Sequence, residues 1–256
     1  MRKSDIYKQY GIEYANGKIL APTGDYIAPL LKKGNSKTGA AVWTYSQLAG
    51  AREWSTKYGT VAGTCAGTCE HCYACTGFYC MPSVRDTLAL HTIITRRTVR
   101  FTGGFKARAI IAQIKADKIA LVRIHAAGDF DSIDDVRTWR DIVKACPDTL
   151  FWTYTKKTYP EVDELNKLEN INIVPSVICG RFNFGTCADL FELLAYDPDA
   201  YICPCGFDEN THCEDCKACA TKKHVIFLLH STSDYNAEND PLYNELKAVF
   251  EKQAAN

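Results

Sequence analysis

Residues 121–136 have the sequence LVRIHAAGDFDSIDDV, which joins two kinds of element. The run 121–125 is rich in large apolar residues and ends shortly before Gly128, so it predicts a β-strand. Ser132 stands directly before an apolar stripe that begins at Ile133 and continues through Val136. A serine in this position predicts the N-cap of a helix. A strand that passes directly into a capped helix is the repeating unit of an α/β fold.

The same alternation continues along most of the chain. Strands are predicted over residues 61–64, 121–125, 150–155, 171–178, 201–202 and 225–229. Helices are predicted over residues 84–99, 105–115, 133–143, 161–168, 189–195 and 242–252. Alternating strands and helices imply parallel strands with helices outside them, and this number of units suits a partial or complete β/α barrel. We therefore expect an α/β protein of that type, with a flat doubly wound sheet as the alternative.

The active site of either fold forms at the carboxyl ends of the strands. That edge would bring together Cys65, residues 125–129, Thr155-Lys156, Ser176 and His230. A chain of 256 residues suits one or two domains. We expect residues 1–54 to be an N-terminal extension packed on a core of residues 55–256. The core would include a cysteine-rich segment, 203–219, and a C-terminal helix, 242–252.

Composition excludes several classes of protein. The chain is 46% hydrophobic, which excludes a disordered protein, and its 30 basic and 30 acidic residues give no overall charge to attract a nucleic acid or a membrane. No apolar run approaches the ~20 residues that cross a bilayer, and residues 1–17 do not resemble a signal peptide. We expect a cytoplasmic protein with reduced thiols.

Thirteen cysteines are the unusual feature of the composition, and ten of them fall in two short stretches. The first group contains Cys65, Cys69, Cys72, Cys75 and Cys80. The second group contains Cys203, Cys205, Cys213, Cys216 and Cys219. Clustered cysteines in a reducing compartment are typical of metal ligands or catalytic groups. Cys146, Cys179 and Cys187 lie apart and are predicted to be small buried hydrophobic residues.

The first group has the spacing C-x3-C-x2-C at Cys65, Cys69 and Cys72. Three thiolates can hold three corners of a 4Fe–4S cluster and leave the fourth iron open to a substrate or cofactor. The alternative is a closed zinc or iron site with Cys75 as the fourth ligand. Cys80 is predicted to be a core residue or to have no role.

The second group offers five thiols for what is normally a four-ligand site. Cys213, Cys216 and Cys219 are its firm members, and the fourth place falls to Cys203 or to Cys205. We predict a second, closed iron–sulfur cluster, with structural zinc as the alternative. Lys217, Lys222 and Lys223 would partly offset its negative charge.

The C-x3-C-x2-C motif after a strand resembles the signature of the radical S-adenosylmethionine superfamily. The resemblance implies that the open iron binds the amino and carboxylate groups of S-adenosylmethionine. An electron would then cleave this cofactor to a 5′-deoxyadenosyl radical, with flavodoxin or ferredoxin as the kind of electron donor. Ala127-Gly128-Asp129 would replace the Gly-Gly-Glu-type motif of that superfamily, and Tyr73 and Ser176 would also bind the cofactor.

A narrower resemblance covers most of residues 60–230. The ordered motifs Cys-x3-Cys-x2-Cys-Tyr-Ala, Arg-Ile-His-x2-Gly-Asp-Phe and Trp-Thr-Tyr-Thr-Lys, and then a cysteine-rich stretch before a strand that ends in His, resemble the phage "gene product eighty-eight" domain family. A phage protein would act in the host cytoplasm. This resemblance implies site roles for His125, Asp129, Tyr154, Lys156 and His230.

Structural roles remain open for most of these residues. Asp129 could simply cap the next helix. His125 and His230 could be structural histidines, and Lys156 could be a solvated loop residue.

A radical S-adenosylmethionine enzyme of unknown substrate is thus the expected function. One alternative is a non-catalytic, metal-stapled module that binds phage nucleic acid. Residues 87–116 would serve it, because they carry six basic residues and no acidic ones. Such a run is more often the solvated face of barrel helices. A thiol redox protein using Cys69 and Cys72 is a weaker alternative, because the extra thiols nearby favour a metal.

Overall fold

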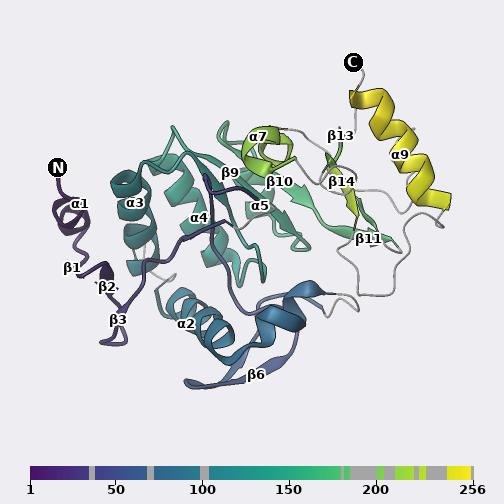
Figure 1. The fold of residues 1–256 in the computed structure, drawn as a ribbon. Helices are drawn as coiled ribbons and strands as arrows, with labels where there is room; N and C mark the ends of the chain where they lie inside the picture. The colour runs from purple at the N-terminus through teal and green to yellow at the C-terminus, as the bar shows by residue number, and fades with distance from the viewer. Residues whose placement is uncertain are drawn as a thin grey trace.

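The computed structural model describes residues 1–34, 38–67, 72–98, 104–179, 182–184, 201–204, 211–221, 225–228 and 241–254. Its centre is a five-stranded sheet with the order β10-β9-β8-β5-β4 (Figure 1). The strands are β4 (Lys32–Lys33), β5 (Val42–Thr44), β8 (Leu121–Arg123), β9 (Leu150–Thr155) and β10 (Ile171–Pro175). Four of them run parallel, and β4 is the antiparallel edge.

Helices connect the parallel strands and cover one face of this sheet. They are α2 (Pro82–Thr98), α3 (Phe105–Asp117), α4 (Ile133–Ala145) and α5 (Pro160–Leu165). Val122 and Phe151 point from the sheet into the main core, where they join Ile110 of α3, Trp139 of α4 and Leu165 of α5. This arrangement has the layers that the alternation of strands and helices predicts.

The cysteine-rich segment covers the opposite face. Because successive side chains of a strand point to opposite faces, Leu121 and Trp152 lie on the other side from Val122 and Phe151. They pack with Val42 and with Ala220. Ala220 belongs to α8 (Ala218–Thr221), which follows α7 (Cys213–Cys216). Figure 1 shows α7 lying over β9 and β10.

A second sheet continues from the edge of the first. It has the order β11-β12-β14-β13, and β11 begins two residues after β10 ends. Its strands are β11 (Val177–Cys179), β12 (Phe182–Phe184), β13 (Tyr201–Ile202) and β14 (Val225–Leu228). The C-terminal helix α9 (Pro241–Ala254) joins it through Gln253, whose amide side chain bonds both backbone polar groups of Ile202 at 2.9 and 3.2 Å.

The N-terminal region and the first cysteine loop contain short elements. They are α1 (Lys3–Gln9), β1 (Tyr14–Ala15), β2 (Lys18–Leu20), β3 (Tyr26–Ile27), β6 (Glu53–Thr56), β7 (Gly59–Ala62), η1 (Tyr73–Cys75) and η2 (Gly77–Cys80). The strand predicted at 61–64 forms as β7, but it pairs antiparallel with β6 in a separate hairpin. The central sheet instead takes β4 and β5 from the predicted N-terminal extension. It therefore begins before residue 55.

The described strands form four open sheets, and none of these sheets closes into a barrel. The structure mixes helices and strands, and the expected barrel stays a prediction. The helix predicted at 189–195 lies outside the described residues. Of the helices that the structure describes, none combines the length and the hydropathy required to span a bilayer.

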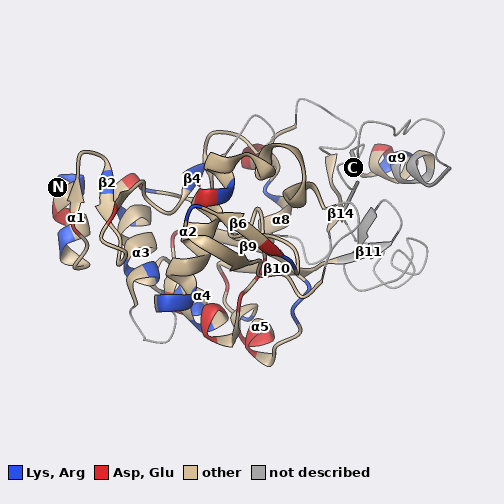
Figure 2. Cartoon of the chain, turned by 90° about the horizontal axis from the view of Figure 1, so that it is seen from below, with Lys and Arg blue, Asp and Glu red and all other residues tan. Residues whose placement is uncertain are grey.

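The basic run 87–116 does not form one exposed surface. Lys106 is fully buried, and its ammonium bonds Asp135 Oδ1 of α4 at 2.5 Å. Arg96 makes a salt bridge of 2.7 Å with Asp131. Elsewhere acidic and basic side chains are interspersed: Figure 2 shows both colours on α4 and red on the neighbouring α5, and Arg137 of α4 pairs with Glu161 of α5 at 2.9 Å. The continuous basic face expected for a nucleic acid is therefore incomplete.

Candidate functional site

The carboxyl ends of three parallel strands meet in one network of backbone hydrogen bonds. Tyr45, just after β5, donates its N–H to the carbonyl of Arg123 at 3.1 Å and accepts from Ala126 N at 2.9 Å. Gln47 N donates to the carbonyl of Ala127 at 2.9 Å. The loop that follows β8 is therefore fixed against the loop that follows β5. This is the edge at which the sequence predicts the site.

Asp129 fastens this loop to the end of β9. Its Oδ1 accepts hydrogen bonds from Phe130 N at 2.8 Å and from the Thr155 hydroxyl at 2.6 Å, and its Oδ2 accepts from Lys156 N at 3.0 Å. The carboxyl is buried, and this burial raises its pKa. Asp129 does not cap α4. That role belongs to Ser132, as predicted, whose hydroxyl accepts from Asp135 N at 3.3 Å.

The first cysteine loop is attached to the same segment. Thr64, which directly precedes Cys65, donates its hydroxyl to the Leu48 carbonyl at 3.0 Å and accepts from Asp129 N at 2.9 Å. Gly128 lies between these partners with φ +81°. A Cβ there would stand 2.8 Å from Thr64 Oγ1 and 3.0 Å from the Gln47 carbonyl. Only glycine fits this position without displacing its neighbours.

Two of the three predicted cluster ligands lie beside this loop. Cys65 and Cys72 are half-buried and pack, together with Cys75, around Ala127 and two further alanines. The Tyr73 hydroxyl donates to the carbonyl of Ala126 and accepts from Arg123 Nη2 at 3.4 Å. The third predicted ligand, Cys69, lies outside the described residues. The structure thus places Cys65, Cys72 and Tyr73 next to the Ala127-Gly128-Asp129 segment.

His125 sits below this edge in a closed polar network. Its side chain is fully buried, and its backbone adopts φ +53°. Its Nε2 lies 3.1 Å from Gln47 Nε2 and 3.9 Å from Asp135 Oδ2. The ring packs edge-on against Phe130 and Trp139. Burial lowers the pKa of His125 to about 3, so this neutral histidine supports the loop from within the core.

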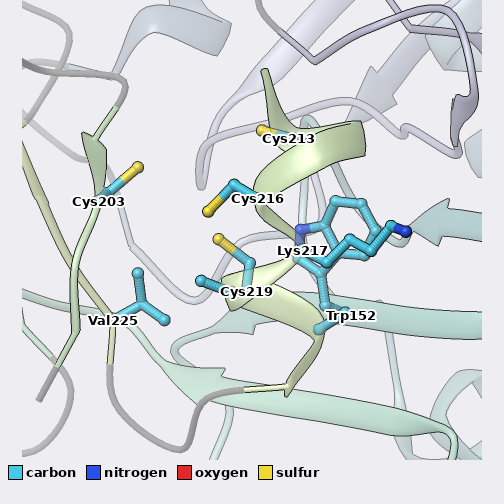
Figure 3. Close-up of a pocket in the computed structure, with 9 residues that line it drawn as sticks. Trp152, Cys203, Cys213, Cys216, Lys217, Cys219 and Val225 are labelled. Atoms are coloured by element: carbon cyan, nitrogen blue, oxygen red, sulfur yellow. The ribbon is translucent and has the colours of Figure 1, made fainter. Parts of the chain in front are cut away.

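The second group of cysteines borders one pocket. Its lining includes Cys203 after β13 and Cys213, Cys216 and Cys219 of α7 and α8, with Trp152 and Lys217 beside them (Figure 3). In Figure 3 the sulfurs of Cys203, Cys216 and Cys219 point into the space between the two segments. The Lys217 side chain extends away from them. Cys205, the other candidate for the fourth place, lies outside the described residues.

Neighbouring elements hold the cysteine-rich segment on the sheet. The Tyr154 hydroxyl donates to Cys219 Sγ at 2.7 Å, and Asn172 Nδ2 donates to the Cys219 carbonyl at 2.9 Å. On the other side, the Glu214 carboxylate accepts from Ala41 N at 2.6 Å. Burial raises the pKa of Cys219 to about 11, so its thiolate requires a positive partner.

Arg123 lies between the two cysteine groups. It shares the sheet face of Leu121 and projects between Tyr73, which follows Cys72, and Tyr154, which contacts Cys219. Its guanidinium carbon stands 5.9 Å from the centroid of the Tyr154 ring. Burial opposes the charge of Arg123, but Tyr73, Tyr154 and two thiols of the cysteine-rich segment interact with it and hold its pKa above the usual value.

The other predicted site residues have less defined positions. Lys156 is exposed, and its backbone N–H donates to Asp129 Oδ2 at 3.0 Å. Ser176 is half-buried at the end of β10, and its N–H donates to the Thr155 carbonyl at 2.7 Å. His230 lies outside the described residues. The structure therefore gathers His125, Asp129, Lys156 and Ser176 at one edge, with Tyr154 on the adjoining face.

Nine cysteines with described side chains are not joined in disulfides. Cys75 and Cys80 contact the small core around Trp54 and Leu88, and Cys146 is buried as predicted. Within the described ranges, no three His, Cys, Asp or Glu side chains stand close enough together to hold a metal ion. A thiolate site seldom exists fully formed without its metal.

Comparison with known proteins identifies the family. The family described as Gene product 88 matches residues 29–222, which is well over half of the chain. The chain belongs to the Gene product 88 family. No curated protein and no solved structure matches it. Membership makes it a phage-type protein, and the matched range contains both cysteine groups.

Three residues of the site are not predicted as site residues by the sequence. Thr64 and Gln47 act through contacts with residues more than sixty positions away, and their local sequence carries no signal of this. Arg123 did carry a signal, because a cation interrupts the otherwise apolar strand Leu121–Ile124. A charged residue at an inward position of a central strand is a candidate functional residue.

Proposed function

We propose that this Gene product 88 protein is a radical S-adenosylmethionine enzyme. The observation that carries the proposal is the bond between Thr64 and Asp129, which joins the Cys65 loop to the loop after β8. In the superfamily that the sequence resembles, these two loops hold the cluster and the methionine part of the cofactor. Both loops lie at the carboxyl edge of a parallel sheet, where α/β enzymes form their sites.

The donor set suits a 4Fe–4S cluster. Cys65, Cys69 and Cys72 would hold three irons. Cys75 contacts the core around Trp54 and also packs beside Cys65 and Cys72, and we assign it a packing role. When bound, the cluster supplies one electron that splits the sulfonium of S-adenosylmethionine into methionine and a 5′-deoxyadenosyl radical, which takes a hydrogen atom from the substrate. The electron would come from a reduced flavodoxin or ferredoxin. The protein's own part is to position and shield the reacting groups.

The loop residues perform this positioning. Gly128 allows the backbone to approach Thr64 and Gln47, and Asp129 joins the loop to the end of β9 through two hydrogen bonds. Because both Asp129 oxygens already accept bonds from the chain, its carboxylate serves first as a structural clasp. If Asp129 also binds the ammonium group of the methionine part, that group would have to donate to the remaining lone pairs of the carboxylate.

The second group would hold a further cluster. Cys203, Cys213, Cys216 and Cys219 line one pocket and supply four thiols, which is the usual complement of a closed 4Fe–4S cluster. Zinc is the alternative metal for this donor set. The incomplete basic face at 87–116 gives the nucleic-acid-binding module less support than the enzyme has.

The test is anaerobic reconstitution of the full chain with iron and sulfide. We expect about eight irons for two cubes. With dithionite, the protein should convert S-adenosylmethionine to 5′-deoxyadenosine and methionine. The Cys65→Ser/Cys72→Ser variant should lose about half of the iron and all of the cleavage, whereas Cys80→Ser should retain both. Full iron loading of the natural protein without any cleavage would overturn the enzyme proposal.

A further inference from the structure

We propose that Arg123 is the counter-charge of the second cysteine site and raises the reduction potential of the cluster bound there. This inference rests on the proposed function only in taking an iron–sulfur cluster as the group held by Cys203, Cys213, Cys216 and Cys219. Arg123 acts through Tyr154 and through its electric field. It is therefore a positioning residue and not a catalytic one.

The first support is the place of Arg123 in the sheet. Its position on β8 puts it on the same face as Leu121, which packs with Ala220 of α8. The neighbouring strand presents Trp152 and Tyr154 on this face, and both adjoin the cysteine-rich segment. Arg123 thus projects from the centre of the sheet on the face that the cysteine-rich segment covers, and its Nη2 donates to the Tyr73 hydroxyl at 3.4 Å, which fixes the position of its charge.

The second support is that the described part of the chain gives Arg123 no acidic partner. Among the described residues, no Asp or Glu oxygen lies within 4.0 Å of its guanidinium. Its buried Nε also has no hydrogen-bond partner there. Arg123 is half-buried, and a cation that is partly removed from water without compensation is unfavourable, so a negative group is expected nearby. Cys213 and Cys219 are among the groups that interact with it, and as cluster ligands they would be thiolates.

The third support is the hydrogen bond between Tyr154 and Cys219. The Tyr154 hydroxyl donates to Cys219 Sγ at 2.7 Å, and the Tyr154 ring lies beside the Arg123 guanidinium. Hydrogen bonds to ligand sulfurs and nearby positive charge both stabilise the reduced, more negative state of a cluster, which raises its potential. Lys217 does not supply this charge, because its side chain extends away from the sulfurs (Figure 3).

The experiment measures the midpoint potential of the second cluster by an EPR-monitored redox titration. It uses the full chain in the Cys65→Ser/Cys72→Ser background, so the second site alone carries iron. Arg123→Gln should make the potential more negative at unchanged iron content. Arg123→Lys, which keeps the charge, should recover most of the difference, and Tyr154→Phe should give a smaller shift in the same direction. Arg137→Gln on α4 removes an exposed arginine and should leave the potential unchanged.

Equal potentials in Arg123→Gln and the parent protein, at equal iron content, would overturn the inference. If the Arg123→Gln variant binds no iron, the Arg123→Lys variant shows whether the charge or the shape of the side chain is responsible. Retention of the cluster with the lysine supports a role of the charge, and its loss with lysine assigns the effect to the shape of the side chain and overturns the proposal. A second site that takes only zinc also overturns it. Failure of the natural protein to cleave S-adenosylmethionine, with the potential shift present, overturns the proposed function alone.

Discussion

Asp129 and Thr155 join the carboxyl ends of β8 and β9, because the Thr155 hydroxyl donates to Asp129 Oδ1 at 2.6 Å. The same carboxylate accepts two backbone N–H groups, and the N–H of Asp129 itself reaches Thr64 beside the first cysteine loop. One buried residue therefore joins, through its side chain and its backbone, three segments that are distant in the sequence. Its hydrogen bonds fix the relative positions of the parts from which the site is built.

Asp129→Asn should destabilise the protein although it changes almost no volume. The amide NH2 would face either the Lys156 N–H or the two donors at Oδ1, so at least one buried donor loses its acceptor. We expect a loss of about 1–3 kcal/mol in the free energy of unfolding, measured by urea denaturation. Asp134→Asn at the exposed start of α4 is the control and should change stability by less than about 0.5 kcal/mol. Equal effects of the two variants would contradict the clasp role.

Sequence reasoning succeeded where the signal is local. The Ser132 cap and the strand 150–155 depend on a few neighbouring residues, and the structure confirms both. Asp129, Lys156 and Ser176 also came together at the predicted edge, because parallel strands place their carboxyl ends at one edge whatever their order. The positions of Asp129 and Ser176 beside Thr155 follow from this rule.

Prediction from sequence failed where the structure of a segment depends on a partner far away in the chain. Residues 61–64 do form a strand, but the choice between the central sheet and a hairpin with β6 depends on tertiary pairing. β5 has only three residues and carries no strong pattern, yet it pairs with β8 in the centre of the fold. Lys106 belonged to a basic run that was expected to be exposed, and its burial depends on Asp135, which lies on another helix.

The buried pair of Lys106 and Asp135 leads to a second prediction. Lys106→Met should cost about 3–5 kcal/mol, because it leaves the Asp135 carboxylate buried without its cation. In the double variant Lys106→Met/Asp135→Asn the uncompensated charge is gone, so its loss should be smaller than the sum of the two single losses. Urea denaturation of the four proteins of this cycle measures the coupling. Strict additivity would show that the pair contributes nothing.

Two buried histidines predict how stability depends on pH. Burial lowers the pKa of His91 to about 4 and that of His125 to about 3. Between these values and the ordinary value of about 6.5, the unfolded chain binds protons that the folded protein does not. Each histidine therefore makes stability fall, as the pH is lowered through this range, by about 1.4 kcal/mol per pH unit.

A substitution at one of these histidines tests this dependence. His125→Asn keeps a residue that tolerates the positive φ of this position and removes the titrating ring. The loss of stability between pH 7 and pH 5 should be smaller in this variant by about 2 kcal/mol. Denaturant titrations of both proteins at the two pH values give the comparison. An unchanged loss would mean that His125 accepts a proton in the folded state.

Gly128→Ala tests the close approach of the two site loops. The new Cβ would stand 2.8 Å from Thr64 Oγ1, in addition to the strain of a positive φ. Gly17→Ala is a matched control, because Gly17 has φ +76° and no atom within 4 Å of the added Cβ. We expect Gly128→Ala to lose about 1–3 kcal/mol more than the control and to bind less iron at the first site after reconstitution. Equal losses of stability and equal iron content in Gly128→Ala and Gly17→Ala would show that Gly128 does not help to position the cysteine loop.

Cys75→Ala distinguishes an open cluster from a closed metal site. Cys75 packs with the core around Trp54, and its sulfur would stand 3.1 Å from a Cβ at Gly50, so we expect it to act as a packing residue. Cys75→Ala should cost about 1 kcal/mol of stability through lost contacts and should leave the iron content and the spectrum of the first cluster unchanged. Cys72→Ala should abolish this cluster. Loss of one metal ion per chain in Cys75→Ala would instead indicate four protein ligands, and a site closed in this way has no open iron to bind S-adenosylmethionine.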